Sequence, residues 1–141
     1  MRILLDTNVL VRAFVSARGP AGEVLGRVTR AHRLLLSPYL LDEVERVLAY
    51  PRLRKIARFE PADVERFLNL LIEAGEVVYP AVDTAVPVSD PDDIAILRTA
   101  AAGRAEVICT LDRHLFRTEV VAWCQQLGIR VKREVELLPR L

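Results

Sequence analysis

Residues 1–11, MRILLDTNVLV, decide the fold of this chain. The run Arg2 to Leu5 is short and mostly apolar, as in a strand that is buried on both faces, and it stops at Asp6. The letters that follow, DTNVLV, turn at once into an apolar helical pattern, and Asp, Thr and Asn are all residues that begin helices well. A strand, an acid and a helix in direct succession indicate the first unit of a parallel sheet.

The same alternation of short apolar runs and helical stripes continues along the chain and predicts five strands. The expected strands are Arg2–Leu5, Arg33–Leu36, Glu76–Tyr79, Glu106–Thr110 and Ile129–Lys132. We therefore expect an α/β protein, a three-layer α/β/α sandwich around a central five-stranded, mainly parallel sheet. The chain has 141 residues and no repeat or linker, so a single domain over residues 1–141 is expected.

Capping residues, prolines in first turns and glycines after last turns mark the helices between these strands. Segment 16–22 is the most loop-like part of the first half of the chain. The expected helices are one directly after Asp6, one that ends near His32, one that begins at Pro38 after the cap Ser37, one from Pro61 to Gly75, one from Pro91 to Gly103 and one capped by Thr118.

Carboxylates recur where the apolar runs stop. Asp6 follows the first strand, Asp112 follows the fourth, Glu43 lies in the helical stretch PYLLDEVERVL, and the cluster DPDD contains Asp90 and Asp93. Open α/β sheets bind ligands at the carboxyl ends of their strands, so these acids are expected to meet in one cleft. Taken alone, each acid is also explained as a helix cap or a turn residue.

Two of these acids are distinguished by the helix face on which they lie. Glu43 shares a face with Leu40 and Val47, and a carboxylate in an apolar stripe costs free energy unless it is paired or metal-bound. Asp90 is the natural N-cap of its helix, with Asp93 in the position of a capping-box acid. Asp93 nevertheless shares a face with apolar residues, so it is the better ligand candidate and Asp90 is the second choice.

Carboxylates that share a cleft repel one another, and bound cations relieve that repulsion. Oxygen ligands without paired Cys or His favour Mg²⁺ or Mn²⁺ over zinc. Thr7, Asn8 and Thr110 are expected to hold the inner carboxylates by hydrogen bonds. Cys109 and Cys124 have no zinc-like spacing and are interpreted as inert core thiols.

The two histidines, His32 and His114, are interpreted as solvated rather than as ligands. The net charge of +1 argues against a strongly basic nucleic-acid binder, but neutralisation of four acids by metal leaves 20 basic residues against 15 acidic ones. The apolar runs are too short to cross a bilayer, and no signal-peptide pattern is present. We therefore expect a cytoplasmic protein without a membrane partner.

Four pieces of the chain resemble the PIN-domain ribonucleases, in the order that the family shows and over nearly the whole length. They are LLDTNVLV with Asp6, SPYLLDEVERVL with Glu43, SDPDDIAILRTA with Asp93, and VICTLDRHL with Asp112. The subgroup that the chain looks most like is VapC-like and contains toxins of bacterial and archaeal toxin–antitoxin systems. The segment DPDD departs from the commoner single Asp at this helix start, which leaves the roles of Asp90 and Asp93 open.

This resemblance implies a Mg²⁺- or Mn²⁺-dependent endonuclease that cuts single-stranded or structured RNA. It implies Asp6, Glu43, Asp93 and Asp112 as catalytic residues and metal ligands, with Asp90 as a further ligand. It also implies a homodimer or higher homo-oligomer held by a protein antitoxin. The basic segment YPRLRKIAR, residues 50–58, is interpreted either as a contact for the phosphate backbone or as a solvated helix face.

Other classes of protein combine an α/β sheet with clustered acids. A haloacid-dehalogenase-type phosphatase needs a second Asp two positions after the first, where this chain has Asn8. A phosphoacceptor receiver needs an early acidic pair that is missing here. A housekeeping RNA-processing or structure-specific nuclease and a catalytically silent PIN-like binding protein remain the alternatives.

Overall fold

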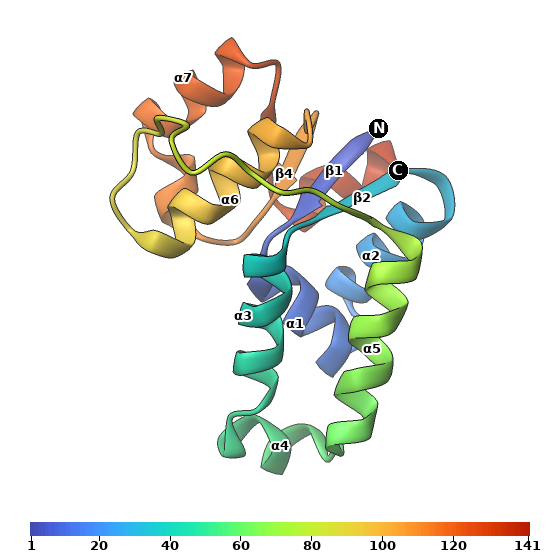
Figure 1. Ribbon diagram of the computed structural model, residues 1–141. Coiled ribbons are helices and arrows are strands. Elements are labelled where there is room, and N and C mark those ends of the chain that lie inside the picture. The colour runs from blue at the N-terminus through green and yellow to red at the C-terminus, as the bar shows by residue number, and fades with distance from the viewer.

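Five parallel strands form the sheet of the computed structural model, which describes residues 1–141 (Figure 1). The strands are β1 (Arg2–Leu5), β2 (Arg33–Leu36), β3 (Glu76–Val77), β4 (Val107–Cys109) and β5 (Arg130–Lys132), in the spatial order β3-β2-β1-β4-β5. Ile3 of β1 is paired with Leu34 on one side and with Val107 on the other. These three central strands are almost fully buried, which is why their sequences are continuous apolar runs.

The strand bounds agree with the sequence prediction at β1 and β2 and are shorter at the other three. β3 was expected to reach Tyr79 and ends at Val77, because it is an edge strand that pairs only with β2. β4 lacks Glu106 and Thr110, although the backbone N–H of Glu106 still donates to the Arg2 carbonyl at 2.8 Å.

Eight α-helices connect and cover the strands, and most begin and end at the predicted residues. They are α1 (Thr7–Val15), α2 (Pro20–Ala31), α3 (Pro38–Leu48), α4 (Pro51–Ala57), α5 (Pro61–Ala74), α6 (Pro91–Ala102), α7 (Thr118–Gln126) and α8 (Glu134–Leu137). Two 3₁₀ helices, η1 (Arg113–Phe116) and η2 (Leu138–Arg140), complete the chain. Thr118 is the first residue of α7 rather than its cap, and α4, α8 and the two 3₁₀ helices were not among the expected helices.

Capping and close packing explain two of the helix ends. The Ser37 hydroxyl accepts a hydrogen bond from the Leu40 N–H at 3.3 Å, as expected of an N-cap. Gly103 follows α6 directly above β2, where a Cβ atom would lie 2.8 Å from Cδ1 of Leu35. Any larger residue at this position would require the Leu35 side chain to shift, which favours glycine at this approach of the helix end to the sheet.

The helices lie on both sides of the sheet, so the predicted α/β/α sandwich is confirmed. In Figure 1, α6 and α7 lie on one side and α1, α2 and α5 on the other. Helices α3 and α5 extend away from the sheet and are joined by α4 at their far ends (Figure 1). Edge-on contacts of the Phe14 ring with Phe59 and Phe67, at centroid distances of 4.8 and 5.1 Å, fix α1 against this extension.

The strand order places a crevice at the carboxyl ends of β1 and β4. The chain leaves β1 through α1 and leaves the neighbouring β4 through η1 and α7, which lie toward the other side of the sheet. Such a switch point is where open α/β sheets bind ligands. No helix in the fold combines the length and the apolar character that a membrane span requires.

Candidate metal centre

A cavity of about 380 Å³ opens at this crevice, and it contains every acid that the sequence pattern had brought together. Six of its lining residues carry a carboxylate. The lining consists of Asp6, Thr7, Asn8, Val11, Arg12, Glu43, Val47, Asp90, Asp92, Asp93, Ile96, Asp112 and His114. The acids come from four separate parts of the chain, so the convergence is a product of the fold and not of local sequence.

Asp6 is held rigidly at the junction of β1 and α1. Its backbone N–H donates to the Cys109 carbonyl of β4 at 2.9 Å, and its side chain is only 8% exposed. One carboxylate oxygen accepts from the Thr7 N–H at 2.7 Å and the other from the Thr110 hydroxyl at 2.6 Å. Burial raises the pKa of Asp6, and the nearby Asp112 and Asp92 add to that effect.

Asp112 lies directly across from Asp6 at the end of β4 and is linked to it through Thr110. The Asp112 N–H donates to the Thr110 hydroxyl oxygen at 2.9 Å, and that hydroxyl in turn donates to Asp6. The Asp112 carboxylate caps η1 by accepting from the His114 N–H at 2.9 Å. The expected supporting role of Thr110 is therefore visible in the geometry.

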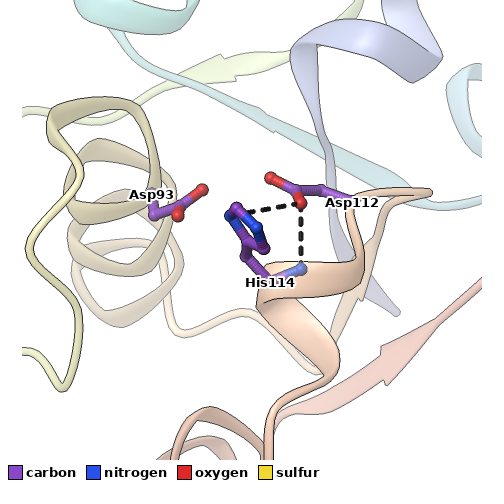
Figure 2. A group of neighbouring side chains, drawn as sticks. All are labelled: Asp93, Asp112 and His114. Atoms are coloured by element: carbon purple, nitrogen blue, oxygen red, sulfur yellow. Dashed lines mark hydrogen bonds and ion pairs between the residues drawn. The ribbon is translucent and has the colours of Figure 1, made fainter.

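Asp93, Asp112 and His114 point toward one another, as Figure 2 shows. One potential ligand atom from each of the three lies within 4.8 Å of the other two. Nδ1 of His114 lies 3.9 Å from a carboxylate oxygen of Asp112. Asp93 is only 7% exposed, and burial, with the nearby Asp112 and Asp90, raises its pKa to about 6.

The structure separates the roles of the three acids in DPDD. Asp90 caps α6, because its carboxylate accepts from the N–H groups of Asp92 at 2.9 Å and Asp93 at 3.3 Å. No reciprocal bond of a capping box is formed, which leaves the Asp93 side chain facing the cavity. Asp92, which is more exposed than Asp93, also lines the cavity and accepts a hydrogen bond from the Tyr39 hydroxyl at 2.6 Å.

Glu43 reaches the same cavity from α3. It is half-buried, and its pKa is raised to about 7 by burial first and then by the negative charges of Asp92 and Asp6. The buried Thr7 hydroxyl, also in the lining, has no close hydrogen-bond partner within the chain, although it lies near enough to Glu43 to offset part of the rise in that pKa. It is therefore available to a carboxylate or to water in the cavity.

Arg12 is the single arginine in the cavity lining, and its charge is already neutralised by the carboxylate of Glu134, which lies outside the lining. Its guanidinium makes two hydrogen bonds, of 2.6 and 3.1 Å, to the two carboxylate oxygens of Glu134. Glu134 is 2% exposed and lies at the start of α8, 122 residues further along the chain. This bidentate pair fixes Arg12 at the wall of the cavity, so its cation is shared with a carboxylate outside the cluster.

The donor set fits a divalent cation. Ligand atoms of Asp93, Asp112 and His114 all lie within 4.8 Å of one another, near enough to share one cation after small side-chain rotations. Carboxylate oxygens dominate the cavity, and the pKa values of Asp6, Glu43 and Asp93 are raised by burial first and then by the negative charge of neighbouring acids. Asp6, Glu43, Asp93 and Asp112, with Asp90 and His114 beside them, are the residues that could hold such an ion.

Two residues of this cavity and its wall escaped the sequence interpretation. His114 was interpreted as solvated, and its side chain is 57% exposed, but it also lines the cavity, because its position two residues after Asp112 places both on the same turn of η1. That Asp-x-His spacing was the one signal that pointed to it. Glu134 gave none, because its role depends on a partner far away in the chain.

The remaining predicted residues lie outside the cavity, apart from Asn8, which is exposed at its wall. Cys109 and Cys124 are free and buried, and burial raises the pKa of the Cys109 thiol to about 12, as expected of an inert core thiol. The cations of segment 50–58 lie on and next to α4, at the far ends of α3 and α5 (Figure 1).

Comparisons with known proteins agree with this geometry. A family model described as PIN domain matches residues 2–114. No curated protein matches the chain. Among solved structures, a chain in the crystal structure of VapBC2 from Rickettsia felis, bound to a DNA fragment from its promoter, has a TM-score of 0.64 at 13% identity. The match covers 94% of the present chain and 98% of the other, and at this identity it shows a shared fold.

Proposed function

Because the chain belongs to the PIN domain family, we propose that it is a Mg²⁺- or Mn²⁺-dependent endoribonuclease and the toxin of a toxin–antitoxin pair. The observation that carries the proposal is the convergence of six carboxylates in one cavity at the switch point of the sheet. A binding protein without catalysis has no need of such a cluster, whose mutual repulsion destabilises the fold. The complete acid set therefore favours a nuclease over a silent PIN-like protein.

The residues of the cavity divide into ligands and supports. Asp6, Asp93 and Asp112 are the proposed catalytic ligands, and Asp90 and His114 lie beside them as further donors. Thr110 fixes the orientation of Asp6, and the Asp6 and Thr110 backbones are themselves anchored on β4 and β5. Glu43 faces this group from α3, where its carboxylate can orient a water molecule by accepting a hydrogen bond.

These acids would hold a divalent cation, which would supply a lowered pKa for bound water and would offset the negative charge of a phosphodiester. The chain itself offers few positive groups for that purpose, since Arg12 is already paired with Glu134. Binding of an RNA phosphate thus depends on prior neutralisation of the acids. The basic segment of α4, with Arg52, Lys55 and Arg58 at its surface, is a proposed contact for the RNA backbone.

An antitoxin partner and self-association belong to the same proposal. The support is the sequence resemblance to VapC-like toxins together with the fold shared with a chain of the VapBC2 structure. Co-expression with the neighbouring reading frame, followed by light scattering of the purified material, tests both points. A monomer that no neighbouring product binds would leave a housekeeping nuclease as the better description.

The central experiment is cleavage of a labelled single-stranded RNA in Mg²⁺ and, separately, in Mn²⁺. Asp6→Asn and Asp93→Asn are expected to lower the rate by at least about 100-fold, because each removes a ligand charge. Asp83→Asn, an exposed acid that does not line the cavity, is the matched control and should cut at the wild-type rate. Wild-type rates in the two ligand variants would disprove the assignment, and calorimetry without Mg²⁺ or Mn²⁺ binding would favour a silent protein.

A further inference from the structure

A second hollow, of about 480 Å³, lies on the other side of the first turn of α6 from the acidic cavity. We call it the tyrosine groove and define it by Tyr39, Tyr79, Val82, Pro91 and Arg98, which are among its lining residues. Pro91 stands between Asp90 and Asp92, and both of these acids line the acidic cavity. The two hollows therefore share the first turn of α6 as a common wall.

Tyr39 joins the two hollows directly. Its hydroxyl donates to the Asp92 carboxylate at 2.6 Å, while its ring belongs to the groove. This hydrogen bond fixes the ring at the edge of the acidic cavity. If one residue of a polymeric ligand lies in the acidic cavity, the neighbouring residue of that ligand therefore lies close to the Tyr39 ring.

Large apolar and aromatic side chains stand exposed around the groove. Tyr79 is 78% exposed, Val82 82% and Tyr39 44%. Tyr79 and Val82 lie in the connection between β3 and α6, outside any helix or strand. Neither side chain belongs to the hydrophobic core or packs against it. Exposed aromatic groups that gather around one hollow are typical of a binding surface.

The charge of the groove is opposite to that of the cavity. No carboxylate lines the tyrosine groove, and Arg98 is its single charged residue. Nε of Arg98 donates to the Thr84 carbonyl at 3.0 Å, which positions the guanidinium and leaves its terminal N–H groups uncommitted. The groove therefore suits a planar aromatic ligand attached to an anionic backbone. The tyrosine rings can stack on the ligand, and the Arg98 guanidinium can contact the anionic backbone.

We propose that the tyrosine groove binds an unpaired RNA base that lies next to the phosphate held in the acidic cavity, with Tyr79 as a stacking platform. This inference rests on the proposed function and narrows its substrate to single-stranded RNA, since a paired base within a helix has both faces covered. A protein segment could also bury the exposed side chains. A nucleic acid is favoured over a protein segment for two reasons. The groove shares the first turn of α6 with the proposed phosphodiester site, and no acidic residue lines the groove.

The test measures binding rather than cleavage. The probe is a 2′-O-methyl RNA about eight nucleotides long, which resists hydrolysis and carries 2-aminopurine at one position at a time. Anisotropy in Mg²⁺ at one fixed salt concentration gives the affinity, and quenching of 2-aminopurine reports stacking. The full-length wild type is compared with Tyr79→Ala, Tyr79→Phe and Leu70→Ala, the last being an exposed apolar residue of α5 outside the groove.

Tyr79→Ala is expected to bind about 10-fold more weakly and to lose the quenching at one position, the effect of removing one stacked base. Tyr79→Phe and Leu70→Ala should bind as the wild type does. Equal affinity of Tyr79→Ala and the wild type would overturn the inference and leave the proposed function intact. Equal binding of single-stranded and duplex probes by the wild type would also overturn it.

Two more results would each count against a base in the groove. If the wild type binds no RNA, the inference and the proposed function both fail. If Tyr79→Ala changes the sedimentation of the protein from dimer to monomer while its RNA affinity is unchanged, a second copy of the chain occupies the groove and the inference is wrong.

Discussion

Removal of one carboxylate from the acidic cavity should stabilise the metal-free protein. Asp93→Asn is the variant of choice, because Asp93 is buried, faces the other acids and leaves the capping of α6 to Asp90. Its pKa is raised from 3.8 to about 6, by burial first and then by Asp112 and Asp90. The charged form of Asp93 is therefore less favourable in the folded chain than in the unfolded one.

The sign of the pH effect follows from proton binding. Between about pH 4 and pH 6 the folded state binds more protons at Asp93 than the unfolded state does, so the free energy of unfolding falls as the pH rises through this window. The raised pKa of Glu43, about 7, extends the fall to neutral pH. The rise in the pKa of Asp93 corresponds to a loss of at most roughly 3 kcal/mol in the free energy of unfolding. Screening by solvent in the open cavity reduces this loss to about 1–2 kcal/mol.

The assay is thermal unfolding in EDTA from about pH 4 to pH 8, with Asp83→Asn as the control for loss of an exposed acid. At the upper end of this range Asp93→Asn should melt about 3–6 °C above the wild type, and at the lower end the two should coincide. Added Mg²⁺ should stabilise the wild type more than the variant. A variant that is less stable than the wild type in EDTA at pH 8 would refute the reasoning and favour an ordinary structural role for Asp93.

Three other perturbations test separate parts of the structure. Thr110→Val removes the hydroxyl that holds Asp6 and should weaken Mg²⁺ binding, measured by calorimetry, about 10-fold or more. Arg12→Ala leaves the buried Glu134 unpaired and should lower the free energy of unfolding in urea by about 2 kcal/mol, less than for a fully buried pair because Arg12 is partly exposed. Arg52→Glu should reduce the slope of the logarithm of RNA affinity against the logarithm of salt concentration by about 0.7 or more. An unchanged slope would reject α4 as a contact for the RNA backbone.

Matched controls exist for each of these variants. Thr29→Val also removes a bonded hydroxyl, but on α2, and should leave Mg²⁺ binding unchanged. Arg27→Ala breaks the exposed pair with Glu23 and should cost less than about 1 kcal/mol. Arg140→Glu introduces the same charge change as Arg52→Glu outside α4 and should have a smaller effect on the salt slope if the contact is specific.

The sheet was predictable because buried parallel strands have continuous apolar sequences. The runs before Asp6 and Ser37 contain no polar interruption and were assigned with their observed bounds. The edge strand β3 was overestimated, since the apolar letters continue to Tyr79, whereas beyond Val77 only the Val78 N–H still donates to β2, to the Leu36 carbonyl at 2.8 Å. Helix α8, with the sequence EVEL, is too short to show a helical period.

The candidate site was predictable only where residues sit at element ends. Asp6 and Asp112 follow strands, and their meeting follows from the parallel order of β1 and β4. The orientation of His114 depends on the turn of η1, and the tyrosine groove depends on how the connection after β3 crosses the sheet. These are tertiary properties that a local pattern does not contain.

The pair between Arg12 and Glu134 gives helix α8 a part in the charge balance of the acidic cavity. A chain that ended before Glu134 would carry an unrestrained guanidinium at the mouth of an anionic pocket, and that group would act as a tethered competitor for any incoming ion. The C-terminal segment thus holds Arg12 at the wall of the cavity and shares its charge, although this segment lies beyond residues 2–114, where the family model matches.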